Sequence, residues 1–185
     1  MAENNTQKIE GFEESTNRQQ FITFTVQGRE YGIDIMTIRE IKGWTETTSL
    51  PNSPDYMRGV INLRGTIVPI MDLRARFNMG STDARKTHVV MIVNIGERLM
   101  GVLVDGVSDI LTVHGDEIRP VPDIDGTQHG DIIAGLVCLE NRMVALLVLE
   151  KLFDKSIEFE CTAEALEQVY EAAGQQEEVH AEQVA

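Results

Sequence analysis

The side chains most capable of chemistry in this sequence are two aspartates and a histidine that lie close together in the chain. Asp105 and Asp109 flank Gly106, and His114 follows five residues after the second aspartate. Carboxylates and an imidazole can bind a divalent metal or exchange protons during hydrolysis. One interpretation of the chain is therefore a small metal-dependent hydrolase that uses Asp105, Asp109 and His114.

The spacing of these residues matches no common catalytic pattern. The chain contains four histidines, none of which has another histidine four residues away. It also lacks the HExxH zinc motif, the GxSxG nucleophile elbow and the GxxxxGK[ST] phosphate loop. Aspartates beside a glycine are typical of turns and strand edges. We therefore predict a protein without catalytic activity, resident metal or cofactor.

The charge of the chain excludes some classes of partner. The 185 residues carry 30 acidic and 16 Lys or Arg side chains, a formal net charge of -14. Such a chain is repelled by phosphates of nucleic acids and by anionic lipids. Much of the excess lies at the ends, since no Lys or Arg follows Lys155 whereas eight acidic residues do. We expect no nucleic-acid partner and solvated acidic ends.

Two further features indicate a cytoplasmic protein. No run approaches the ~20 apolar residues of a membrane span, and the first residues lack the apolar core of a secretion signal, so we expect no direct membrane insertion. The two cysteines, Cys138 and Cys161, show neither CxxC spacing nor a disulfide framework. Because Cys138 lies in an apolar run, we predict that it is a small buried side chain.

Short apolar runs separated by turns dominate the middle of the chain and predict β-hairpins. We expect four of them, pairing residues 21–26 with 31–35, 60–63 with 66–70, 89–95 with 99–104, and 136–139 with 143–149. Pro69 cannot donate to a strand ladder, so its strand must be an edge or bulged there. Asp72 should cap a short helix that ends near Phe77, and Thr162 should cap a longer C-terminal one.

The sequence also repeats itself loosely. Residues 32–41 resemble residues 101–110, and residues 59–70 resemble residues 135–146. Two similar small barrels would explain this, and chance matching of apolar strands is the alternative. We expect a disordered tail over 1–19, a domain over 20–155 with subdomains of about 20–85 and 86–155 that could be intertwined, and an acidic helix and tail over 156–185.

Several residues are not needed for local structure and could bind a partner. Arg64 projects from a hairpin tip where Gly65 supplies the positive φ, and a guanidinium there can clamp a carboxylate. Glu40 lies between two apolar residues, Ile38 and Ile41. Val107 and Ile110 occupy the matching segment of the second repeat. The alternative is that these four apolar residues belong to the core and that Glu40 is merely solvated.

Three motifs resemble those of the CheW family of bacterial chemotaxis proteins. They are YGIDI at 31–35 with REI at 39–41, RGVINLRGTIVPIMDL at 58–73, and VDGVSDI at 104–110 with IRP at 118–120. The similarity runs in order from about residue 21 to 153. It implies a mostly β fold of two SH3-like five-stranded barrels with a groove between them, a few short helices and a C-terminal helix.

The resemblance also implies a function. It predicts a cytoplasmic, non-enzymatic adaptor that joins methyl-accepting chemoreceptors to the regulatory domain of the histidine kinase CheA in membrane-associated arrays, with other CheW copies as further partners. CheA and CheV share the fold, but both are longer than this chain. An adaptor of a non-flagellar array, for surface motility or biofilm, is the alternative. The positions that match partner-binding residues of the family are Ile38, Glu40, Gly59, Arg64, Val107 and Ile110.

Overall fold

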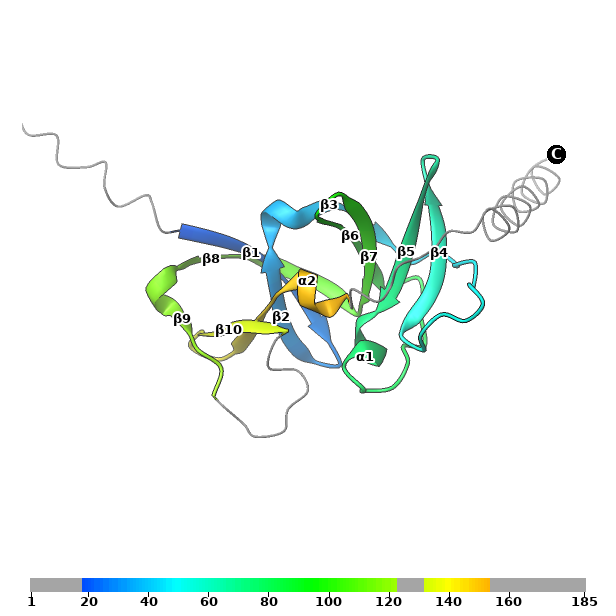
Figure 1. Cartoon of the computed structure of the whole chain (residues 1–185). Coiled ribbons are helices and arrows are strands. Elements are labelled where there is room, and N and C mark those ends of the chain that lie inside the picture. The colour runs from blue at the N-terminus through cyan, green and yellow to red at the C-terminus, as the bar shows by residue number, and fades with distance from the viewer. Residues whose placement is uncertain (1–17, 123–131, 154–185) are drawn as a thin grey trace, which may run out of the picture.

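The computed structural model describes residues 18–122 and 132–153, which fold into strands with very little helix (Figure 1). The strands of the first half are β1 (Arg18–Val26), β2 (Arg29–Asp34), β3 (Ile38–Gly43), β4 (Met57–Leu63) and β5 (Thr66–Asp72). Those of the second half are β6 (Val89–Ile95), β7 (Arg98–Val104), β8 (Gly106–His114), β9 (Ile118–Arg119), β10 (Ile133–Cys138) and β11 (Met143–Leu147). Four single turns of helix complete the set, namely η1 (Ile35–Thr37), α1 (Leu73–Arg76), η2 (Gly115–Glu117) and α2 (Leu149–Leu152).

The strands form two sheets of matching order, which are the two SH3-like barrels that the sequence predicted. The sheet of the first barrel runs β8-β1-β2-β11-β10-β9, and that of the second runs β3-β6-β7-β5-β4. Apart from the two-residue β9, each strand of one sheet has a counterpart in the other. The first sheet contains the hairpin β1–β2 and the second contains β6–β7, and a further hairpin joins each of them through a parallel pairing, β11 with β2 and β5 with β7.

The second barrel is formed by one continuous segment, β3 to β7, which is inserted between the strands of the first barrel. After β2, the chain crosses to the second sheet, where β3 pairs with β6. After β7, it crosses back to the first sheet, where β8 pairs with β1. Both barrels therefore need residues from both halves, and a boundary near residue 85 does not separate the two sheets. The division into two subdomains remains a prediction.

The internal repeat has a steric basis at two glycines. Gly32 in β2 lies opposite Leu146, and Gly101 in β7 lies opposite Ile70. A Cβ atom at Gly32 would lie 3.0 Å from Leu146 Cδ2, and one at Gly101 would lie 2.2 Å from Ile70 Cδ1. Each glycine thus leaves room for a large side chain from the parallel neighbouring strand. Because the two sites are equivalent, the repeat reflects a shared packing requirement.

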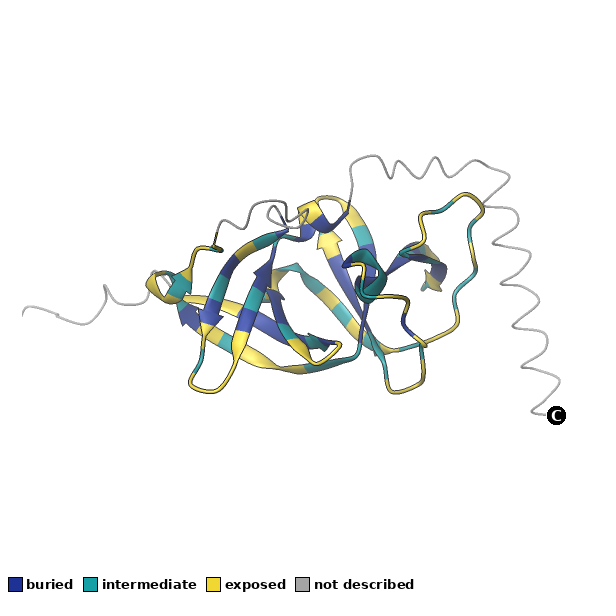
Figure 2. Cartoon of the chain, turned by 90° about the horizontal axis from the view of Figure 1, so that it is seen from below, coloured by how far each residue is buried: buried dark blue, intermediate teal, exposed yellow. Residues whose placement is uncertain are grey.

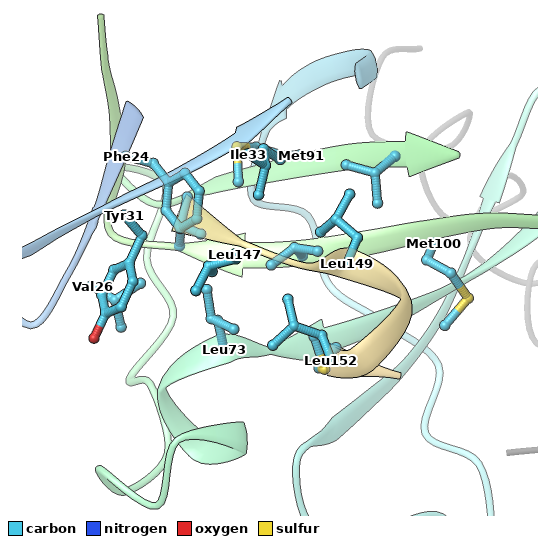
Figure 3. Packing of buried hydrophobic residues seen from close by; sticks show 14 of the residues in the cluster. Phe24, Val26, Tyr31, Ile33, Leu73, Met91, Met100, Leu147, Leu149 and Leu152 are labelled. Atoms are coloured by element: carbon cyan, nitrogen blue, oxygen red, sulfur yellow. The ribbon is translucent and has the colours of Figure 1, made fainter. Parts of the chain in front are cut away.

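The buried side chains form three clusters because inner strands alternate between two apolar environments. Val90 and Ile92 of β6 point into the core of the second barrel, whereas Met91 and Val93 join a larger cluster between the barrels. The first barrel has its own core around Phe21 and Leu146. We call the larger group the central cluster. The central cluster contains residues of β1, β2, α1, β6, β7, β11 and α2 (Figure 3). The turns between strands are exposed (Figure 2).

Two equivalent helical turns close the central cluster. Asp72 is fully buried and caps α1, and its carboxylate accepts hydrogen bonds from the backbone N–H groups of Arg74 and Ala75 and from both N–H and Oγ1 of Thr82. The helical turn predicted after Asp72 is confirmed. At the matching position before α2, Val148 provides no side-chain cap. The helix predicted to begin at Thr162 lies outside the described residues.

The structure corrects several expectations. Cys138 is exposed and not buried, because it points to the outer side of β10 while Val137 fills the first barrel. β1 begins at Arg18, so residues 18 and 19 belong to the strand and not to the tail. No element was predicted for the segments that form β3 and β8. Pro69 lies in an inner strand, but β5 pairs with β7 only from Ile70 onward, so its missing N–H breaks no ladder.

No helix among the described residues is long and apolar enough to span a membrane.

The close approach of Gly101 and Ile70 can be tested by a double-mutant cycle. Gly101→Ala should lower the free energy of unfolding by about 1–3 kcal/mol, because its methyl group overlaps Ile70 Cδ1. Ile70→Val removes that atom and should cost about 0.5–1.5 kcal/mol alone. In the double variant the new methyl fills the vacated space, so the combined loss should be smaller than the sum. Urea unfolding measures all three.

The matched control is Gly43→Ala, since a Cβ there meets no atom within 4 Å. We expect this change to alter the free energy of unfolding by less than about 1 kcal/mol. Strict additivity of the Gly101 and Ile70 variants would contradict the proposed steric coupling.

Candidate functional site

The apolar residues predicted to bind partners lie on two edge strands, β3 of the second sheet and β8 of the first. In β3, Ile38 is opposite Val93 and Ile41 is opposite Met91, and both of these neighbours belong to the central cluster. In a regular strand, residues three apart point to opposite faces. A shift of register between Ile38 and Glu40 brings Ile38 and Ile41 to the same face. The irregular strand therefore presents two isoleucines beside the central cluster.

The same arrangement occurs on β8. Val107 is opposite Phe24 and Ile110 is opposite Ile22, with a register shift between Ile22 and Phe24. Ser108 and Asp109 therefore face the single residue Thr23. The buried Thr23 hydroxyl donates to the carbonyl oxygen of Asp109 at 3.0 Å and accepts from its N–H at 3.1 Å. This side chain holds the bulge and fixes the direction of the residues on either side.

We call Ile38, Ile41, Val107 and Ile110 together the edge-strand surface. Ile38 and Val107 pack partly against the central cluster. Ile41 and Ile110 stand further out, with 41% and 50% of their surface exposed. Ile110 matches a partner-binding position of the family, whereas Ile41 was named only among the four apolar candidates, although the repeat aligns the two. The structure places them at equivalent positions, so Ile41 belongs to the same surface.

Glu40 and Arg64 are brought together from distant segments. The Arg64 guanidinium at the tip of the β4–β5 hairpin lies 3.5 Å from a carboxylate oxygen of Glu40 on β3. The arginine side chain is 84% exposed, so the pair contributes at most about 1 kcal/mol to stability. The hairpin tip itself is fixed by the Gly65 N–H, which donates to Asn62 Oδ1 at 2.8 Å. The arginine is therefore positioned without being needed for the fold.

Gly59 differs from the other predicted partner residues because it is buried. It has φ +125, and a Cβ there would lie 2.1 Å from the carbonyl oxygen of Thr48. That contact belongs to the bridge between Thr48 and Val60, whose two backbone hydrogen bonds tie the β3–β4 connection to β4. Gly59 thus has a demonstrable backbone role, and direct contact with a partner remains a prediction.

The aspartates and the histidine considered for hydrolysis have separate structural roles. Asp105 accepts from the Gln27 N–H at 2.6 Å and from Arg74 Nη2 at 2.7 Å. Asp109 Oδ1 accepts from the N–H of Ile110, and His114 ends β8 as the N-cap residue of η2, its backbone N–H donating to Glu117 Oε2. Within residues 18–122 and 132–153, no three His, Cys, Asp or Glu side chains are grouped to hold a metal.

A shallow, open hollow of about 480 Å³ lies beside Trp44 and Arg58. The Arg58 guanidinium stacks over the indole ring at 5.7 Å and donates to the Thr82 carbonyl oxygen. At the rim, Arg85 donates two hydrogen bonds to Asp83 and so lowers the pKa of that carboxyl. The polar groups of Arg58 are thus directed at the protein itself, and Trp44 packs against the core of the second barrel.

Comparison with known proteins identifies the family. The family model described as the CheW-like domain matches residues 20–156, about three quarters of the chain. The chain belongs to the CheW family. The chemotaxis protein CheW of Klebsiella aerogenes is 43% identical over 134 residues, covering 72% of this chain and 81% of that protein. The probable chemotaxis protein CheW of Rhizobium etli is 41% identical over 138 residues, covering 75% and 89%.

A solved CheW structure agrees with the fold. The scaffolding protein TtCheW from Thermoanaerobacter tengcongensis superposes with a TM-score of 0.69 at 27% sequence identity, covering 80% of this chain and 94% of that one. CheW proteins are non-catalytic adaptors and scaffolds, so this chain is a chemotaxis adaptor and not an enzyme. The family assignment made from three motifs is confirmed, and the hydrolase interpretation is wrong.

The backbone role of Gly59 predicts a large loss of stability on substitution. Gly59→Ala should lower the free energy of unfolding by at least about 3 kcal/mol, because the methyl group would displace the Thr48 backbone. Gly28→Ala is the matched control, since Gly28 also has positive φ but meets no atom within 4 Å. It should cost only about 1 kcal/mol. Equal losses in urea unfolding would contradict the steric explanation.

The Thr23 hydroxyl should be needed to hold the bulge of β8. Thr23→Val keeps the shape of the side chain but removes both hydrogen bonds to Asp109, and should cost about 1–3 kcal/mol. Hydrogen exchange at the Asp109 amide should accelerate, while exchange at Val104 in β7 stays unchanged. Thr25→Val is the control, because its hydroxyl makes only a 3.5 Å contact with the Gly106 carbonyl. An equal effect of both variants would exclude a special role for Thr23.

Proposed function

We propose that this chain couples methyl-accepting chemoreceptors to the histidine kinase CheA in signalling arrays. The observation that carries the proposal is the edge-strand surface, where Ile41 and Ile110 are large apolar side chains exposed at equivalent positions of β3 and β8. Exposed apolar residues are typical of protein-binding surfaces. The names of the relatives, chemotaxis protein CheW, support the same system over an array for surface motility or biofilm.

A connector of this kind needs a rigid body with more than one binding face and no reaction chemistry. The shared central cluster supplies the rigidity, because apolar side chains of both barrels are buried against one another there. We expect the helical hairpin tip of a receptor to lay apolar side chains on the edge-strand surface, as helices do on apolar surfaces of their partners. The regulatory domain of CheA would contact the end of one barrel.

Individual contacts of this kind are expected to be modest. A micromolar dissociation constant corresponds to about 8 kcal/mol, and multivalent assembly in an array adds the rest. Contacts with further copies of CheW would contribute to the same lattice. The array would lie at the cytoplasmic side of the membrane, where this chain would be recruited through its partners and without insertion of its own.

Arg64 provides the test of the site. Arg64→Ala should weaken binding to either the CheA regulatory domain or the receptor hairpin by more than about 1 kcal/mol, because a positioned arginine at an interface is a common hot spot. Isothermal titration calorimetry with both partners from the same organism measures this. The unfolding transition should be unchanged, since the surface ion pair contributes little to the fold.

Arg98→Ala is the matched control, because Arg98 is an exposed arginine that begins β7 beside another turn of the second barrel. Its loss should leave both affinities unchanged. Unaltered binding of Arg64→Ala to both partners would show that Arg64 is not a contact residue. A wild-type chain that binds neither partner would contradict the proposed function itself.

A further inference from the structure

A carboxylate lies at the point where the chain returns from the second sheet to the first. Asp105 stands between β7, which ends at Val104 in the second sheet, and β8, which begins at Gly106 in the first. Its N–H donates to the carbonyl oxygen of Thr25 in β1 at 3.0 Å, and its Oδ2 atom accepts from the Gln27 N–H in the β1–β2 turn at 2.6 Å. Asp105 is therefore anchored on the first barrel by two hydrogen bonds.

The other carboxylate oxygen of Asp105 is directed to the second barrel. Its Oδ1 atom accepts from Arg74 Nη2 at 2.7 Å, and His88 Nε2 lies 3.9 Å from the same atom. Arg74 belongs to α1, which lies against β5 and β7, and His88 directly precedes β6. Only 25% of the Asp105 side chain and 23% of the Arg74 side chain are exposed, so solvent screens this ion pair only in part. One carboxylate thus joins the two barrels, with one oxygen atom on each.

A second arginine of α1 also reaches the first barrel. Arg76 Nε donates to the carbonyl oxygen of Leu152 at 2.8 Å, and Leu152 ends α2, which follows β11 of the first sheet. Arg74 and Arg76 therefore leave one short helical turn of the second barrel and attach to two separate points of the first, Asp105 and Leu152. Two points of attachment restrict rotation between two bodies much more than one point does.

These links supply a constraint that the central cluster does not. Burial of apolar side chains holds the barrels together but depends little on direction, whereas a hydrogen bond weakens steeply when its donor and acceptor are misaligned. α1 is itself held in place, because the buried carboxylate of Asp72 accepts from the N–H groups of Arg74 and Ala75. At the other crossing between the sheets, the repeat aligns Asp105 with Met36, which carries no charge and is 83% exposed. The carboxylate link is therefore a feature of one crossing and not of both.

We propose that Asp105 is a positioning residue, which sets the angle between the two barrels and thereby the affinity for a partner that contacts both. The consequence for binding rests on the proposed function, since the exposed isoleucines expected to contact the receptor hairpin lie on different sheets, Ile41 on the second and Ile110 on the first. A hairpin that contacts both needs one angle, because a chain that holds this angle only part of the time binds in proportion to that fraction. The CheA regulatory domain, which would contact the end of one barrel, has no such requirement.

Asp105→Asn tests the bridging role of the carboxylate. The variant keeps the shape of the side chain but leaves a single acceptor oxygen, and the amide nitrogen in place of the other oxygen is a donor. The side chain can then accept from Gln27 or from Arg74 and not from both. We expect the two barrels to occupy a wider range of angles in this variant.

The angle can be measured in the full chain as a distance between two spin labels by double electron–electron resonance. One label is placed on the exposed Cys138 of the first barrel, and the other on Arg98→Cys, at an exposed position of the second. Cys161→Ser leaves Cys138 as the only native cysteine. Asp105→Asn should broaden the distance distribution or shift its maximum.

Arg76→Met is a second variant, since it removes the link to Leu152 and keeps an unbranched apolar stem. It should change the distance distribution in the same way. Glu30→Gln is the matched control, because the Glu30 side chain is 20% exposed and its ion pair with Arg142 at 3.0 Å lies within the first barrel. The control should leave the distribution unchanged. An unaltered distribution in both Asp105→Asn and Arg76→Met, or an equal change in Glu30→Gln, would overturn the proposal.

Calorimetric titration measures the consequence for binding, with the receptor hairpin fragment and the CheA regulatory domain from the same organism. Asp105→Asn should weaken hairpin binding about three- to tenfold and leave binding to the CheA domain unchanged. A general loss of stability would affect both partners alike, so equal weakening of the two, or unchanged hairpin affinity, would overturn the inferred effect on binding. Failure of the wild type to bind the hairpin would instead contradict the proposed function, and the distance measurement would still decide the role of Asp105.

Discussion

The insertion of one whole barrel between the strands of the other is the constraint on which the rest of this structure depends. The segment β3 to β7 forms the second sheet, and the first sheet pairs β1 and β2 with β8 and β11, so it closes only when strands from both sides of that segment meet. The crossing also draws apolar side chains from both halves into the central cluster. One packed body results, in which buried side chains and not a flexible linker hold the two barrels together.

Bulges on the edge strands β3 and β8 produce the exposed apolar positions of the edge-strand surface. A regular edge strand would bury one of two apolar residues three positions apart and point the other away. The register shifts near Glu40 and Asp109 bring both to the side of the central cluster. The outer residue of each pair stays exposed because the strand lies at the edge, where no further strand covers it. Apolar area is thus presented on a rigid support, which suits an adaptor that has no chemistry to perform.

The two barrels are equivalent in packing but not in charge. Gly32 and Gly101 make the same room for a neighbouring side chain, and α1 and α2 follow matching strands. The charged residues have diverged on this common frame. Asp72 caps α1 with a buried carboxylate whereas Val148 caps nothing, and Arg64 corresponds to Glu140. Packing requirements preserve the apolar pattern of a repeat, while exposed positions are free to change and can distinguish one face from the other.

The sequence alone determined the four hairpins, the internal repeat and the family, because these depend on residues close together in the chain or on recognisable motifs. It also predicted as partner residues Ile38, Glu40, Arg64, Val107 and Ile110, which the structure leaves at least partly accessible. Tertiary structure decided what depends on distant residues. β3 and β8 became strands through partners about fifty and about ninety residues away. Cys138 points outward because of the phase of β10, and Gly59 is buried by Thr48. Ile41 joined the surface only through a bulge, whose position depends on the partner strand and not on local preference.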